Sequence, residues 1–262
     1  MTTVRQINEF LLSRAPASLA EDWDSVGIHC GREDQPVTKI MVALDASETA
    51  MQEAVEQGCD LLVTHHPRIF KGIDFVNDRS ATGKALLYAI SHNLAVVCHH
   101  TNLDCVAGGI NDLLAEALGL RNVTVLDPKG EKDGKPCGYV HVGDVDETTL
   151  PEFAAFVKKT LGCAGLRYAD GGKPVRRVAV GGGACGFAAG AVNTCGCDTF
   201  VTADLGYHEF CNNADEGISM IDAGHFQTEN LICPVLAGWL RAEFPSVPVL
   251  ISEKHTDVIR FL

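Results

Sequence analysis

The 262-residue sequence has no uninterrupted run of about eighteen apolar residues, so a membrane-spanning helix is not expected. It also lacks a cluster of lysines and arginines, and its formal net charge is −13. Because such a charge repels phosphate backbones and anionic lipids, nucleic acids and membranes are disfavoured as partners. Aromatic residues make up only 6% of the chain, which leaves the core to valine, leucine, isoleucine and alanine.

The sequence holds eleven cysteines but no Cys-x-x-Cys pair, only Cys195-x-Cys197. This absence removes support for a zinc ribbon or a thioredoxin-like redox site. The first residues lack the apolar stretch of a signal peptide, so we expect reduced thiols and a cytoplasmic protein. Most of the cysteines should be small buried hydrophobic residues.

A repeated pattern organises the chain. Residues 39–45 predict a strand, 46–58 an amphipathic helix and 59–66 a second strand, which together form one βαβ unit. The same order recurs at 176–204, where Gly-Cys-Asp again opens the second strand. Such a duplication predicts an α/β fold of two similar halves. We expect the halves to span residues 1–126 and 151–262, with a connector at 127–150 that is rich in proline, glycine and charge.

Each half continues through a second helix into another buried strand, and a histidine follows with an acidic residue four positions later. The pairs are His100 with Asp104 and His225 with Glu229. If these segments are helical, the spacing places both side chains of a pair on one face, where they can bind one ion. His100 has two open roles, because it can be a ligand itself or transfer protons beside one.

Thr64-His65-His66-Pro67 closes a hydrophobic strand, and the carboxyl ends of strands in open α/β sheets are where ligands bind. Consecutive strand residues point to opposite faces, so one ion takes both histidines only if the chain bends there. Two neighbouring ions can take one each. Imidazole nitrogens combined with carboxylate oxygens suit Zn, Fe, Mn or Co better than calcium. The sequence therefore predicts a site for divalent metal ions at this strand end.

Two further motifs leave alternatives open. Gly181-x-Gly183-x-x-Gly186 follows a strand and opens a helix, and Asp204 ends the next strand, which satisfies the dinucleotide fingerprint of an oxidoreductase. The glycines can equally let the backbone approach a substrate phosphate, or form a plain tight turn. His208, with Glu209, is a candidate proton-transfer residue or the first turn of a helix.

These residues resemble the dinuclear-metal-centre family named GTP cyclohydrolase 1 type 2 homologues. The resemblance spans essentially the whole chain and rests on Glu21 to Gly27, Leu62 to Pro67, His100 to Asp104, Gly181 to Gly186, Thr202 to Asp204, and Gly224-His225 with Glu229. It implies that two divalent ions are bound by His65, His66, Asp104, His225 and Glu229. One departure is Ala203 before Asp204 where relatives often have glycine, which is tolerated unless φ is positive at that residue.

The resemblance also implies two α/β halves that face each other across the metal site, and a ring-shaped homohexamer of the compact form without an inserted domain. The expected chemistry is hydrolysis of a small substrate, with His100 or His208 transferring protons. The family name implies that a guanine nucleotide loses formate as its imidazole ring opens. A metal-binding or storage protein without catalysis remains an alternative, as does the dinucleotide-binding oxidoreductase.

Overall fold

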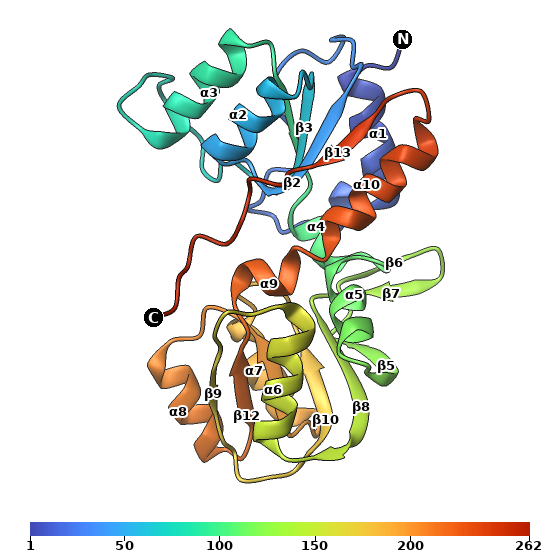
Figure 1. Cartoon of the computed structure of the whole chain (residues 1–262). Coiled ribbons are helices and arrows are strands. Elements are labelled where there is room, and N and C mark those ends of the chain that lie inside the picture. The colour runs from blue at the N-terminus through green and yellow to red at the C-terminus, as the bar shows by residue number, and fades with distance from the viewer. The chain divides into compact units, whose positions relative to one another are not determined.

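The computed structural model describes residues 1–262 and divides the chain into two compact units (Figure 1). Unit 1 comprises Met1–Leu103 with Ile232–Thr256, and unit 2 comprises Asp104–Leu231 with Asp257–Leu262. Both units combine helices with a largely parallel or mixed sheet, which confirms the predicted α/β class. None of the helices has the length and apolar character that crossing a membrane requires.

Unit 1 is built on a five-stranded sheet in the order β1-β4-β3-β2-β13, in which only β1 is antiparallel to its neighbour. The central strands β2 and β3 begin with apolar runs, as expected for strands covered by helices on both faces, and end in the polar residues Asp45 and Thr64 to His66. Helices α2 and α3 pack on one face, and α1 and α10 lie on the other (Figure 1). The strands are β1 (Gly27–Cys30), β2 (Ile40–Asp45), β3 (Leu61–His66), β4 (Ala95–Cys98) and β13 (Val249–Ile251), and the helices are α1 (Val4–Arg14), η1 (Ala17–Leu19), α2 (Glu48–Glu56), α3 (Ala81–Ser91) and α10 (Ile232–Glu243).

Unit 2 contains a six-stranded sheet in the order β5-β8-β10-β11-β12-β9, with parallel pairing from β10 to β12, and a separate β6-β7 hairpin. One apolar cluster joins α5 and α6 to the sheet, and a second joins α7 to it. The strands are β5 (Arg121–Leu126), β6 (Gly130–Lys132), β7 (Lys135–Cys137), β8 (Val140–Thr148), β9 (Arg167–Ala169), β10 (Val175–Val180), β11 (Thr199–Thr202) and β12 (Ser219–Asp222). The helices are α5 (Ile110–Ala117), α6 (Leu150–Leu161), η2 (Gly186–Ala188), α7 (Ala189–Thr194), α8 (Tyr207–Asp215) and α9 (His225–Glu229), and α4 (Thr101–Cys105) contains the first boundary between the units.

The repeated Gly-Cys-Asp sequence makes the same local structure in each unit. Asp60 accepts hydrogen bonds from the backbone amides of residues 38 and 39, at 2.6 and 3.2 Å. Asp198 accepts them from the amides of residues 176 and 177, at 2.9 and 2.8 Å. Each carboxylate thereby ties the start of one strand to the start of the next, and the preceding glycine has a positive φ in both copies.

The units do not follow the boundaries expected from the sequence. Residues 127–150 do not form a bare connector, because β8 is a sheet strand whose Val140 and Val142 are buried in unit 2. Residues 232–256 return to unit 1, where β13 pairs in parallel with β2. The helix that the glycine motif was expected to open begins only at η2, since the chain first forms a loop in which Gly183 has a left-handed φ of +60°.

Candidate metal site

Three histidines gather at the carboxyl edge of the unit 1 sheet. His65 and His66 end β3, and His100 follows the neighbouring parallel strand β4. The candidate ligand atoms of the three side chains all lie within 4.8 Å of one another. Although His65 and His66 are consecutive, their ring centroids are only 4.7 Å apart. Unit 1 therefore presents a compact group of imidazoles, which we call the imidazole group.

Each ring of the imidazole group is held through its Nδ1 atom. His66 Nδ1 donates to Asp45 Oδ1 at 2.6 Å, and His65 Nδ1 donates to the carbonyl oxygen of His99 at 3.1 Å. His100 Nδ1 donates to Asp24 Oδ1 at 3.0 Å. A proton on Nδ1 leaves the lone pair on Nε2, and this is how metal-binding histidines are oriented in proteins.

The two supporting aspartates are ionised in the folded protein. Burial opposes ionisation of Asp24, but hydrogen bonds from His100 and Thr101 outweigh it and hold the pKa of that carboxyl well below its usual range. Asp45 behaves in the same way, because hydrogen bonds from His255 and His66 overcome its burial and lower its pKa. His255 Nε2 lies 2.8 Å from Asp45 Oδ2. Asp45 thus connects a candidate ligand with the segment that follows β13.

Unit 2 carries a second candidate group, in which His225 and Glu229 lie one turn apart on α9. The predicted four-residue spacing brings His225 Nε2 within 3.0 Å of Glu229 Oε2. His225 Nδ1 donates to Asp204 Oδ2 at 2.8 Å, so this ring is also oriented by a carboxylate. Glu229 is buried. We call Asp104, His225 and Glu229 the carboxylate group.

The glycine-rich loop is shaped around Glu229. A Cβ atom at Gly183 would lie 2.0 Å from Glu229 Oε1, and the left-handed φ of this residue disfavours any side chain. The other half of the dinucleotide fingerprint, Asp204, is hydrogen-bonded to His225. Both features favour a metal site over a dinucleotide site. Ala203 is not among the residues with positive φ, so its methyl group is accommodated as predicted.

A carboxylate oxygen of Asp104 lies within 4.8 Å of one of Glu229. Burial raises the pKa of the Cys185 thiol, and the charges of Asp104 and Glu229 raise it further. Asn111 connects the two regions, because its side chain donates to the Asp104 carbonyl at 2.9 Å and accepts from the Gly182 amide at 2.7 Å. Asn111 therefore ties the backbone at Asp104 to the glycine-rich loop.

Sequence reasoning missed the residues that support the ligands. They are Asp24, Asp45 and Asn111, together with His255. Asp45 could have been found, because it ends the strand beside β3 and the carboxyl ends of parallel strands lie at one edge. Asn111 could not, since its role depends on a contact with a loop far along the chain.

His208, Glu209 and His99 lie outside the two candidate ligand groups. His208 is exposed on the first turn of α8, with its ring against Tyr207, and its role in proton transfer stays a prediction. Glu209 forms the helix cap, because its carboxylate accepts from the Gly206 amide at 2.6 Å. His99 is a core residue, and burial lowers its pKa to about 3.

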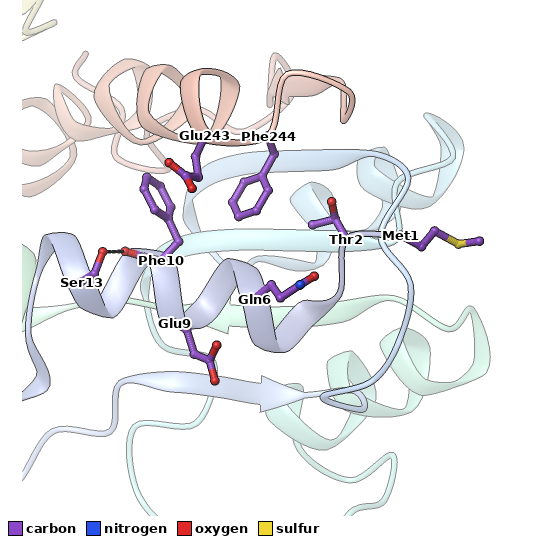
Figure 2. Close-up of a pocket in the computed structure, with 8 residues that line it drawn as sticks. All are labelled: Met1, Thr2, Gln6, Glu9, Phe10, Ser13, Glu243 and Phe244. Atoms are coloured by element: carbon purple, nitrogen blue, oxygen red, sulfur yellow. Dashed lines mark hydrogen bonds between the residues drawn. The ribbon is translucent and has the colours of Figure 1, made fainter.

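A separate hollow of about 540 Å³ lies between α1 and the end of α10 (Figure 2). Phe10 and Phe244 meet edge to face there, with ring centroids 5.6 Å apart. None of the expected metal ligands lines it, and its residues are Met1, Thr2, Gln6, Glu9, Phe10, Ser13, Glu243 and Phe244. The hollow therefore adds nothing to the candidate metal site.

All eleven cysteines are free thiols, and nine of them are buried, in line with the expected role as small hydrophobic residues. The donors offered by the two groups are imidazole nitrogens and carboxylate oxygens. This mixture fits Zn, Fe, Mn or Co. The fit is supported by the orientation of four histidine rings through Nδ1, which a chance surface cluster does not require.

Comparison with known proteins places the chain among described relatives. The family model for Duf34/NIF3 (NGG1p interacting factor 3) matches residues 2–258. A Clostridium acetobutylicum protein named GTP cyclohydrolase 1 type 2 homolog is 33% identical, over 98% of each chain. A Staphylococcus aureus protein of solved structure, described as hypothetical, has a TM-score of 0.90 at 26% identity and covers 99% of each chain. The crystal structure of a Bacillus cereus protein related to NIF3 also has a TM-score of 0.90, at 24% identity, and covers 100% of this chain and 99% of that one.

Proposed function

Because the chain belongs to the Duf34/NIF3 family, we propose that it binds two divalent metal ions and uses them to hydrolyse a small substrate. The observation that supports this most strongly is that histidines in both units are oriented through Nδ1 by carboxylates or a carbonyl. The proposed ligands come from the imidazole group and the carboxylate group, and they are His65, His66, Asp104, His225 and Glu229.

The residues around the ligands have distinct proposed tasks. Bound divalent ions would supply a nucleophile from water at neutral pH. Asp45 and Asp204 fix the imidazoles of His66 and His225, which keeps Nε2 as the ligand atom. His100 is held in the same way by Asp24, and we assign it the transfer of protons at Nε2. If His100 is instead a ligand, replacing it will remove metal as well as activity.

The substrate class follows from the relatives rather than from the geometry. Their printed name, GTP cyclohydrolase 1 type 2 homolog, makes a guanine nucleotide the first compound to test. The expected reaction is hydrolytic opening of the imidazole ring with release of formate. The resemblance also implies a toroidal homohexamer, which light scattering of the purified protein would test.

The test measures metal content and formate release from GTP on the same metal-loaded samples. Wild type should release formate, and Glu229→Ala should lose both metal and activity because it removes a buried ligand. Glu243→Ala, an exposed glutamate, is the matched control and should keep both. A wild type that binds about two ions per chain but releases no formate from GTP would contradict this substrate and favour a metal-binding protein without this reaction.

A further inference from the structure

Two exposed aromatic rings lie beside the imidazole group. Trp23 and Phe70 are roughly parallel, with an interplanar angle of 27° and ring centroids 5.6 Å apart. The two residues are 57% and 53% exposed, although large apolar residues are usually covered. In a chain with so few aromatic residues, such a pair in solvent is a candidate binding surface.

The aromatic pair borders a residue of the candidate metal site directly. The ring of His100 meets Phe70 edge-on at 5.6 Å and Trp23 edge-on at 6.0 Å. His100 in turn lies within the imidazole group. A molecule that stacks on these rings is therefore placed next to the side chains that would bind metal and move protons.

The segment that carries Trp23 is fixed before any ligand arrives. Asp24 accepts hydrogen bonds from the Thr101 amide at 3.0 Å and from its hydroxyl at 2.6 Å. The Glu21 amide donates to the same hydroxyl at 2.9 Å. Because Thr101 follows His100 directly, one small network positions both the candidate proton-transfer residue and the indole. Such preorganisation lowers the cost of binding a rigid ligand.

Phe70 belongs to a long loop that leaves the strand of His65 and His66. Residues 67–80 contain neither helix nor strand, and loops of this length without regular structure are uncommon in compact domains, where they are either functional or linker segments. The loop is tied at its base, since Arg68 Nη2 donates to the Ala81 carbonyl at 2.5 Å. Phe75 is also exposed in this loop. It offers a matched control for Phe70.

We propose that Trp23 and Phe70 form a stacking surface for a planar heterocyclic ring of the substrate, an inference that rests on the proposed function. Two exposed π faces favour a flat aromatic ring, whereas a sugar phosphate alone has no such face to offer. The neighbouring imidazole group then receives the part of the ring that reacts. The substrate class is a molecule with a nucleobase-like ring.

Fluorescence of Trp23 tests this directly. The chain has two tryptophans, so Trp239→Phe makes Trp23 the sole reporter. In that background, guanosine should quench the emission saturably, with excitation at the red edge of tryptophan absorption. Phe70→Ala should weaken binding about tenfold, as expected for the loss of one stacked aromatic contact. Phe70→Tyr should restore it, and Phe75→Ala should leave it unchanged.

Ribose 5-phosphate, which lacks a planar base, should not quench. Metal content is measured on the same samples, and it should not change in Phe70→Ala. If guanosine does not change the Trp23 emission of a metal-loaded protein, the stacking surface is contradicted and the metal proposal is not. A protein that never binds metal but still stacks guanosine would overturn the metal proposal instead. A changed molar mass of Phe70→Ala without guanosine binding would assign the surface to contact between copies of the chain.

Discussion

The candidate ligands of the two units differ in chemistry although the units share a repeated strand pattern. Unit 1 offers three imidazoles, and unit 2 offers two carboxylates with one imidazole. Both units nevertheless orient a histidine with an aspartate near a strand end, Asp45 for His66 and Asp204 for His225. Each unit thus pairs an aspartate with a histidine, while the candidate donor atoms of the two units differ.

Gly183→Ala should have the largest effect, and it acts on unit 2 alone. A methyl group here would lie 2.0 Å from Glu229 Oε1, at a residue with a left-handed φ. We expect a loss of about 1–3 kcal/mol in the free energy of unfolding, together with weaker metal binding. Chemical denaturation and metal titration measure the two effects. Gly190→Ala, where an added Cβ contacts nothing within 4 Å, is the control, and equal effects of the two variants would contradict this account.

Variants of the supporting aspartates test whether both units orient a metal-binding histidine through a carboxylate. Asp45→Asn and Asp204→Asn each remove the charge that favours a proton on the Nδ1 atom of a histidine. Loss of such a support lowers metal affinity by about 10- to 100-fold. Competition with a chelator measures this. Weaker metal binding in only one of the two variants would contradict the parallel between the units. Asp146→Asn, at an exposed residue, is the control and should leave metal affinity unchanged.

A smaller effect is expected from Glu53, which stabilises the segment after β13 in unit 1. The Glu53 carboxylate accepts hydrogen bonds from Ser252 Oγ and from the amides of Glu253 and Lys254, just before His255. Burial opposes ionisation, but these bonds outweigh it and lower the pKa of Glu53 below its usual value. A lowered folded-state pKa gives stability that is present above the unfolded pKa of about 4.3 and is lost as the pH falls.

Glu53→Gln should therefore cost about 1–2 kcal/mol of unfolding free energy at neutral pH, and the difference from wild type should shrink in acid. Urea denaturation at several pH values measures this. Glu56→Gln, an exposed partner of Lys254, should cost less than about 0.5 kcal/mol. A penalty for Glu53→Gln that does not depend on pH would show that the carboxylate charge is unimportant.

The sequence predicted the local elements well because they depend on neighbouring residues. The apolar runs of β2 and β3, the repeated Gly-Cys-Asp turn and the one-turn spacing of His225 and Glu229 are all local signals. The local signals were sufficient to predict that His65 and His66 end a strand, as they do in β3. Local patterns indicated the histidines and acidic residues as candidates, and the family resemblance joined His65, His66, Asp104, His225 and Glu229 into one ligand set.

The parts that were missed depend on contacts between distant residues. β13 joins unit 1 because it pairs with β2, and nothing within 249–251 specifies that partner. The sequence predicted a connector where β8 lies, because the acidic residues of 144–148 outweigh the short pattern of buried residues at 140–142. Asn111 and Asp24 gain their roles only from the loops that they meet in the folded chain.

The most direct test of the central claim is a calorimetric metal titration of the metal-free protein, with wild type beside His65→Ala from unit 1 and Glu229→Ala from unit 2. Wild type should bind about two divalent ions per chain, and each variant should bind fewer or bind them more weakly, because both groups supply ligands. Wild-type stoichiometry and affinity in both variants, or a wild type that takes up no metal, would contradict the account.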